Sequence, residues 1–125
     1  MTHLLIVIAH LLMGGAFVVF GLRNVSAVPG LAKVLEGRKV PMPVTAARIG
    51  VGLQLVGGAL TLLGPFVPYA GVLGGLALIV FLVLATVLFH PAWELNGDER
   101  KAHLNPLIMN TCLVGAFVLV IAYGL

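Results

Sequence analysis

The sequence predicts an all-α integral membrane protein: an up-and-down bundle of four transmembrane helices, with a short amphipathic interfacial segment between the first helix and the second. Composition is the first observation, because 61% of the 125 residues are hydrophobic and only 9% are charged. The mean hydropathy is +1.17, whereas soluble domains carry about 25% charged residues. The second observation is that polar breaks divide the chain into four apolar runs of about twenty residues, the length that crosses a bilayer. We therefore expect one transmembrane domain covering residues 1–125.

The first span is expected at about residues 4–22, which contain no charge and one strongly polar side chain, His10. At about 1.5 Å per residue, this length matches a hydrocarbon core of about 30 Å. The stretch lacks the basic start of a signal peptide, so we interpret it as a true spanning helix. One face collects small and polar residues at helical spacing, and it should pack against the other helices. Its members are His3, His10, Gly14, Phe17, Gly21 and Asn24.

Residues 23–43 form a linker that contains most of the basic residues. Within it, Leu31, Val34 and Leu35 alternate with Lys33 and Glu36. This pattern is typical of a short amphipathic helix lying on the membrane interface.

The second span is expected at about residues 44–63, with Arg48 near its start, where a long side chain can reach the headgroups. Gln54 shares a face with glycines and should point into the bundle. The third span, about 69–89, follows a short uncharged hairpin, and the fourth, about 106–125, opens with a proline in its first turn. The fourth span also holds the single cysteine, Cys112, which we expect to be a small buried apolar residue.

The basic residues predict the orientation of the bundle. All seven Lys and Arg residues fall in or beside the two longer loops, 23–43 and 90–104. By the positive-inside rule these loops are cytoplasmic and both termini are outside. The same positive charge shows no basic helix or arginine–aromatic interleaving, so we expect no nucleic-acid partner.

The segment from His90 to His103 is the main polar interruption, and it holds the only tryptophan and three of the four acidic residues. Its depth near the cytoplasmic boundary matches that of several polar groups on the other helices, which predicts a shared ligand pocket. The candidate residues are His90, Trp93, Asn110, Arg48, Asn24 and, nearer mid-bilayer, Gln54. The alternative is structural, because Trp and Arg anchor helices at interfaces and buried amides form interhelical hydrogen bonds that contribute about 0.6 kcal/mol.

The sequence contains no motif for metal binding, phosphate binding or nucleophilic catalysis. No Cys/His cluster, phosphate loop or nucleophile with its base is present, so we expect no metal site. His10 and His90 should lie near opposite membrane faces and cannot share a haem iron. We interpret His10 as a core histidine with a satisfied hydrogen bond.

Five short motifs follow one another along the chain: Gly21-Leu-Arg23, Gln54-Leu-Val-Gly57-Gly58, His90-Pro-Ala-Trp93, Asp98-Glu-Arg100 and Met109-Asn110. Together they resemble the DoxX family of small four-helix bacterial membrane proteins over nearly the whole chain. The resemblance implies a bacterial inner membrane location. Some members of that family are described as membrane subunits of thiosulfate:quinone oxidoreductases, and others associate with redox or stress-defence partners.

Two positions depart from the family pattern. Gln54 stands where the family has Glu on the second helix, and Met109 stands where it has Lys on the fourth. If these family residues form a charge pair, this chain has lost both members together. On that hypothesis, Gln54→Glu should destabilise the protein more than Gln54→Glu combined with Met109→Lys.

Three functions remain open. The first is an accessory or binding subunit whose pocket takes a quinone or another amphipathic small molecule, or a partner protein. There Trp93 would stack on the ligand, His90 and Asn110 would donate hydrogen bonds, and Arg48 would supply positive charge. The second is a catalytic membrane subunit of a thiosulfate:quinone-type oxidoreductase, although the chain has no cofactor motif of its own. The third is a structural or assembly protein, including a homo-oligomer, in which glycine-mediated packing alone matters.

Overall fold

The computed structural model describes all residues from 1 to 125, and they form helices and connecting turns without any strand. The elements are α1 (Thr2–Val25), α2 (Val28–Gly37), α3 (Pro43–Leu63), α4 (Ala70–Phe89), the 3-10 turn η1 (Ala92–Glu94) and α5 (Gly97–Gly124). Four of the helices, α1, α3, α4 and α5, are long and apolar enough to cross a membrane. This confirms the expected all-α membrane bundle.

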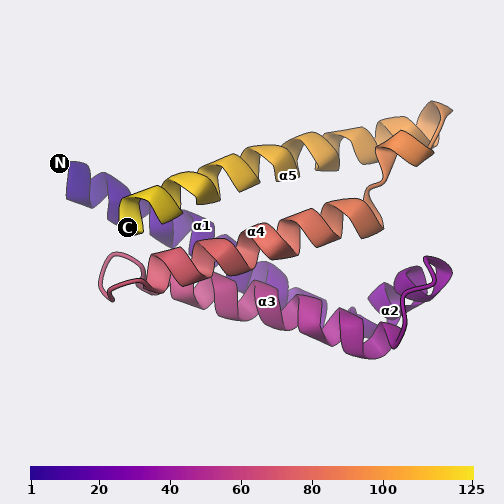
Figure 1. Cartoon of the computed structure of the whole chain (residues 1–125), viewed down its shortest axis with the longest axis horizontal. Helices are drawn as coiled ribbons and strands as arrows, with labels where there is room; N and C mark the ends of the chain where they lie inside the picture. Colours follow the sequence, from indigo (N-terminus) through magenta and orange to yellow (C-terminus); the bar gives the residue numbers. More distant parts are fainter.

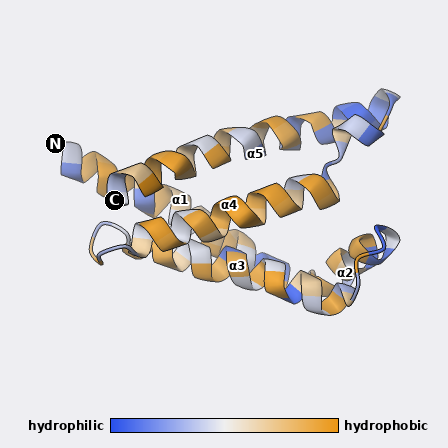
Figure 2. Ribbon diagram, in the orientation of Figure 1, coloured by the Kyte–Doolittle hydropathy of each residue, from blue (hydrophilic) through white to orange (hydrophobic).

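The four long helices run side by side, and the two ends of the bundle differ in character (Figure 1). One end holds both chain termini and the α3–α4 turn, and we call the adjoining half of the bundle the terminal half. The other end holds α2, η1 and the start of α5, together with all seven Lys and Arg residues. We call that half the basic half, and Figure 2 shows hydrophilic residues gathered at its end.

The terminal half contains an aromatic cluster in which three helices pack together. The ring of Phe17 in α1 packs edge-on against Phe117 in α5 at a centroid distance of 5.3 Å, and against Phe81 in α4 at 6.3 Å. The buried cluster around these rings also contains Leu78 and Leu82 of α4 and Val120 of α5. Because rings from three helices meet here, the bundle has a packed core in this half.

Glycines bring the helices into close contact. A Cβ atom at Gly74 of α4 would lie only 2.5 Å from the backbone nitrogen of Thr61 in α3. One at Gly14 of α1 would lie 2.7 Å from the Gly58 carbonyl oxygen in α3. Backbone atoms cannot rotate away as a side chain can, so these positions accept only glycine at this helix spacing.

The predicted inward faces of the first two spans are confirmed, except that His3 is exposed. Their buried residues include His10, Gly14, Phe17 and Gly21 on α1, and Gln54, Gly57, Gly58 and Thr61 on α3. On α4 the buried residues include Gly71, Gly75, Leu78 and Leu82. The predicted role of His10 is also confirmed, since its Nδ1–H donates to the Ile6 carbonyl at 2.8 Å.

The amphipathic segment is helix α2, which packs on the basic half. Ala32 and Leu35 are buried against Ala47 of α3, and Leu88 and Phe89 of α4 cover the same cluster. The charged residues of the segment, Lys33 and Glu36, are exposed on its other side. This separation of faces suits a helix lying on the membrane interface.

Two expectations about the fourth span are wrong. Helix α5 begins at Gly97 rather than near Pro106, so much of the polar interruption is helical and Pro106 lies inside the helix. Asp98 and Glu99 occupy the first turn, where acidic side chains interact favourably with the helix dipole. Cys112 is exposed rather than buried, because it lies on the side of α5 away from the bundle.

Candidate functional site

The basic half contains a cavity of about 720 Å³ between α2, α3 and α4. The cavity is also lined by Asn24 at the end of α1, by His90 after α4 and by His103 of α5. Fourteen of its nineteen lining residues are hydrophobic. Phe81 lines it as well, so the cavity begins where the aromatic cluster ends. A mainly apolar space with a few polar groups is the usual composition of a small-molecule site, and this volume lies within the usual range of about 300–1,000 Å³.

Two histidines form one polar region of the cavity wall. The Nδ1 atoms of His90 and His103 lie 3.1 Å apart, a hydrogen-bonding distance, and their ring centroids are 5.4 Å apart. One Nδ1 must donate and the other accept, so at least one of the two rings is neutral in this arrangement. Neither Nε2 atom has a hydrogen-bond partner within the protein. Each Nε2 therefore remains able to bond a ligand atom.

A pair of amides forms the second polar region. The Asn24 Nδ2 group of α1 donates to Gln54 Oε1 of α3 at 2.9 Å, and both residues line the cavity. Gln54 is only 4% exposed, so this bond satisfies an amide oxygen that would otherwise be costly to bury. The Gln54 amide nitrogen and the Asn24 oxygen keep hydrogen-bonding capacity for a ligand.

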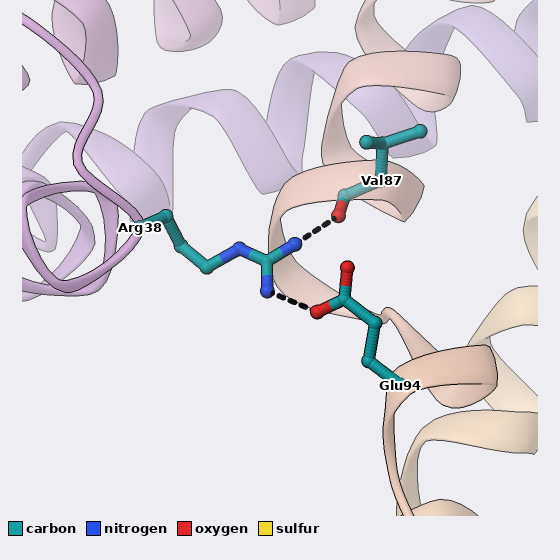
Figure 3. Close-up of polar contacts among 3 residues, drawn as sticks. All are labelled: Arg38, Val87 and Glu94. Atoms are coloured by element: carbon teal, nitrogen blue, oxygen red, sulfur yellow. Dashed lines mark hydrogen bonds and ion pairs between the residues drawn. The ribbon is translucent and has the colours of Figure 1, made fainter.

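An arginine fastens the α2–α3 connection to the far end of α4 (Figure 3). Arg38 Nη1 pairs with Glu94 Oε2 at 2.7 Å, and Nη2 donates to the Val87 carbonyl oxygen at 3.0 Å. Val87 lies in the last turn of α4, where carbonyl groups lack helical partners. The two contacts hold α2, one wall of the cavity, beside α4 and η1.

The structure groups the predicted site residues differently from the single pocket that we expected. His90, Asn24 and Gln54 line the cavity, whereas Arg48, Trp93 and Asn110 do not. Trp93 is 54% exposed on η1. Asn110 donates its amide hydrogen to Thr86 Oγ1 at 3.0 Å, which joins α5 to α4 outside the cavity.

Arg48 lines a separate groove of about 530 Å³ between α1, α2 and α3. A helix turns by about 100° per residue, so Arg48 lies about 120° around α3 from Gln54. The two residues therefore face different spaces. His103, which does line the cavity, is the residue that the sequence reasoning missed. The available signal was that two histidines bracket one helix–turn–helix connection.

The suggested charge-pair positions do not meet in this fold. Gln54 is buried and bonded toward α1, whereas Met109 on α5 is 64% exposed. Helix α4 lies between α3 and α5 (Figure 1). The hypothesis that a lysine at position 109 would compensate a glutamate at position 54 is therefore wrong for this structure.

The side chains that line the cavity belong to few chemical classes. No carboxylate, thiol or hydroxyl side chain lines it, and no group of three His, Cys, Asp or Glu residues could hold a metal ion. The wall offers apolar surface, imidazole nitrogens and amide groups. These groups can hold and orient a ligand through its oxygen atoms.

The chain is similar to the Inner membrane protein YphA of Escherichia coli (strain K12), with 28% identity over 121 residues. The alignment covers 96% of this chain and 83% of that protein. No family model matches the sequence, and no solved structure matches it. Together with the four apolar helices, the similarity supports a multi-pass inner membrane location.

Proposed function

We propose that this multi-pass membrane protein is an accessory or binding subunit that holds an amphipathic small molecule in the cavity of its basic half. The supporting observation is the pairing of apolar walls with the His90–His103 and Asn24–Gln54 groups in one space of about 720 Å³. A soluble polar metabolite would gain little from such walls. A wholly apolar lipid tail would leave the imidazole and amide groups unpaired at a cost in free energy.

The ligand class follows from these two requirements. Its body should be an apolar ring or chain, packed between α2, α3 and α4. It should carry at least one carbonyl or hydroxyl oxygen that bonds the free Nε2 of His90 or His103, or the Gln54 amide. A quinone has this combination, with ring carbonyls that accept hydrogen bonds and an apolar tail.

The orientation is part of the proposal. The positive-inside rule assigns the basic half to the cytoplasmic side, with residues 23–43 and 90–104 cytoplasmic and both termini outside. In a Cys112→Ser background, the Lys101→Cys protein should resist a membrane-impermeant maleimide added to whole cells, whereas the Thr2→Cys protein should react. The opposite labelling pattern would reverse the assignment.

Binding can be measured with the short-chain quinone analogue decylubiquinone as the probe. The only tryptophan, Trp93, lies three residues after His90, so quenching of its fluorescence reports occupation of the nearby cavity. Gly50 lines the cavity, and a Cβ there would meet nothing within 4 Å. Gly50→Leu should therefore narrow the cavity without disturbing helix packing, and His90→Gln should remove one imidazole.

We expect saturable quenching in the native protein. Gly50→Leu should weaken the saturable component by crowding the ligand, and His90→Gln should weaken binding about threefold to tenfold, the equivalent of one lost hydrogen bond. Far-UV circular dichroism checks that both variants keep the fold. Equal quenching in all three proteins would overturn the proposal. Turnover of thiosulfate with the same analogue by the purified protein would favour the catalytic-subunit alternative instead.

A further inference from the structure

The groove that contains Arg48 is distinct from the cavity. Its other lining residues are Val25 of α1, Val28 and Pro29 of α2, and Val51, Gly52 and Leu55 of α3. Among these residues only Val51 also lines the cavity, so the two spaces lie on different sides of α3. The volume of about 530 Å³ is large enough to hold part of a lipid.

Arg48 has no anionic partner in the protein. The two ion pairs of the structure join Arg38 to Glu94 and Lys101 to Asp98. No acidic residue lines the groove, and Arg48 is the only Lys or Arg residue lining either this groove or the cavity. It lies five residues inside α3, about 7 Å along the helix axis from the first residue, Pro43. A cation at this depth is stabilised by pairing with an anion or by reaching the headgroup region.

The rest of the groove continues from Arg48 toward mid-bilayer. Arg48, Gly52 and Leu55 lie on one face of α3, and Leu55 is about 10 Å deeper than Arg48. Gly52 adds no side chain, and a Cβ there would meet nothing within 4 Å, so the floor is open. A cationic group at the interface followed by an apolar channel matches a phosphate headgroup followed by an acyl chain.

We propose that this groove binds one anionic phospholipid of the leaflet on the basic side, with Arg48 pairing to its phosphate and an acyl chain lying over Gly52 and Leu55. The charge of the groove favours an anionic lipid over a zwitterionic one, because the groove offers a cation and no carboxylate for an ammonium group. The site is independent of the ligand cavity.

The test is native mass spectrometry of the full-length protein after delipidation and titration with phosphatidylglycerol or phosphatidylethanolamine. Arg48→Gln removes the charge, and Gly52→Leu blocks the channel. Arg100→Gln is the matched charge control, because Arg100 is exposed on the same half and lies outside the groove. Gly50→Leu is the matched steric control, because it adds the same side chain to the cavity and leaves the groove open.

The native protein should bind one phosphatidylglycerol in preference to phosphatidylethanolamine. Arg48→Gln and Gly52→Leu should each weaken phosphatidylglycerol binding by about fivefold or more, while the Arg100→Gln and Gly50→Leu proteins stay within about twofold of the native protein. Equal losses for Arg48→Gln and Arg100→Gln would mean diffuse attraction and would overturn the proposal. So would equal binding of the two lipids, or displacement of phosphatidylglycerol by millimolar inorganic phosphate, which would indicate a site for a free anion. Loss of quinone binding in Gly50→Leu with lipid binding retained would separate the two sites.

Discussion

Replacing Gly74 by alanine should loosen the contact between α3 and α4. The added Cβ would lie 2.5 Å from the Thr61 nitrogen, 2.6 Å from Thr61 Oγ1 and 2.8 Å from the Gly57 carbonyl oxygen. Carbon atoms prefer non-bonded separations of about 3.5 Å or more, so the helices must separate by about 1 Å. Overpacking of this kind typically costs up to about 3 kcal/mol. The higher helix propensity of alanine returns about 1 kcal/mol, which leaves a net loss of about 2 kcal/mol in the free energy of unfolding.

The same substitution at Gly52 is the control. A Cβ at Gly52 meets nothing within 4 Å, so only the helix propensity changes, and the free energy of unfolding should rise by about 0.5–1 kcal/mol. Unfolding by sodium dodecyl sulfate in mixed micelles, followed by circular dichroism, measures both variants. Similar stabilities for Gly74→Ala and Gly52→Ala would refute the packing argument.

Three further changes test other contacts with the same assay. Thr61→Val should stabilise the protein by about 1 kcal/mol, because the buried Thr61 hydroxyl has no hydrogen-bond partner; a loss of stability would show that the hydroxyl is bonded. Gln54→Glu should lower the free energy of unfolding by about 3 kcal/mol, the cost of a charge inside the membrane. Adding Met109→Lys should recover none of this loss, because that side chain faces away from the bundle. Recovery of stability in the double variant would support the charge-pair hypothesis. Arg38→Gln should cost no more than about 1 kcal/mol, because the ion pair is partly exposed, yet it should speed amide hydrogen exchange in α2; unchanged exchange would contradict its role in holding that helix.

The inward faces of the first two spans could be predicted because their small and polar residues recur at helical spacing between lipid-facing aliphatic residues. The amphipathic pattern of the linker likewise predicted the short helix α2. These features depend on the local sequence and on the lipid environment. They can therefore be predicted without knowing how the helices pack.

The start of α5 could not be predicted in this way. A charged stretch followed by Pro106 has the pattern of a loop and a helix start, but residues 97–105 continue the helix on its solvent side. The error hid His103, which is brought to His90 only because α5 begins early and folds back along α4. Arg48 was grouped with the cavity residues because it lies at a similar depth in the membrane. Its position around the axis of α3, however, places it in another groove.

The most direct test of the proposed ligand cavity is an experimental density map of the protein in a lipid environment with decylubiquinone in excess. The proposal predicts elongated density between α2, α3 and α4, with a ligand oxygen about 2.7–3.2 Å from an imidazole nitrogen of His90 or His103. A map in which the side chains close this space, or in which the analogue lies only elsewhere on the protein, would contradict it.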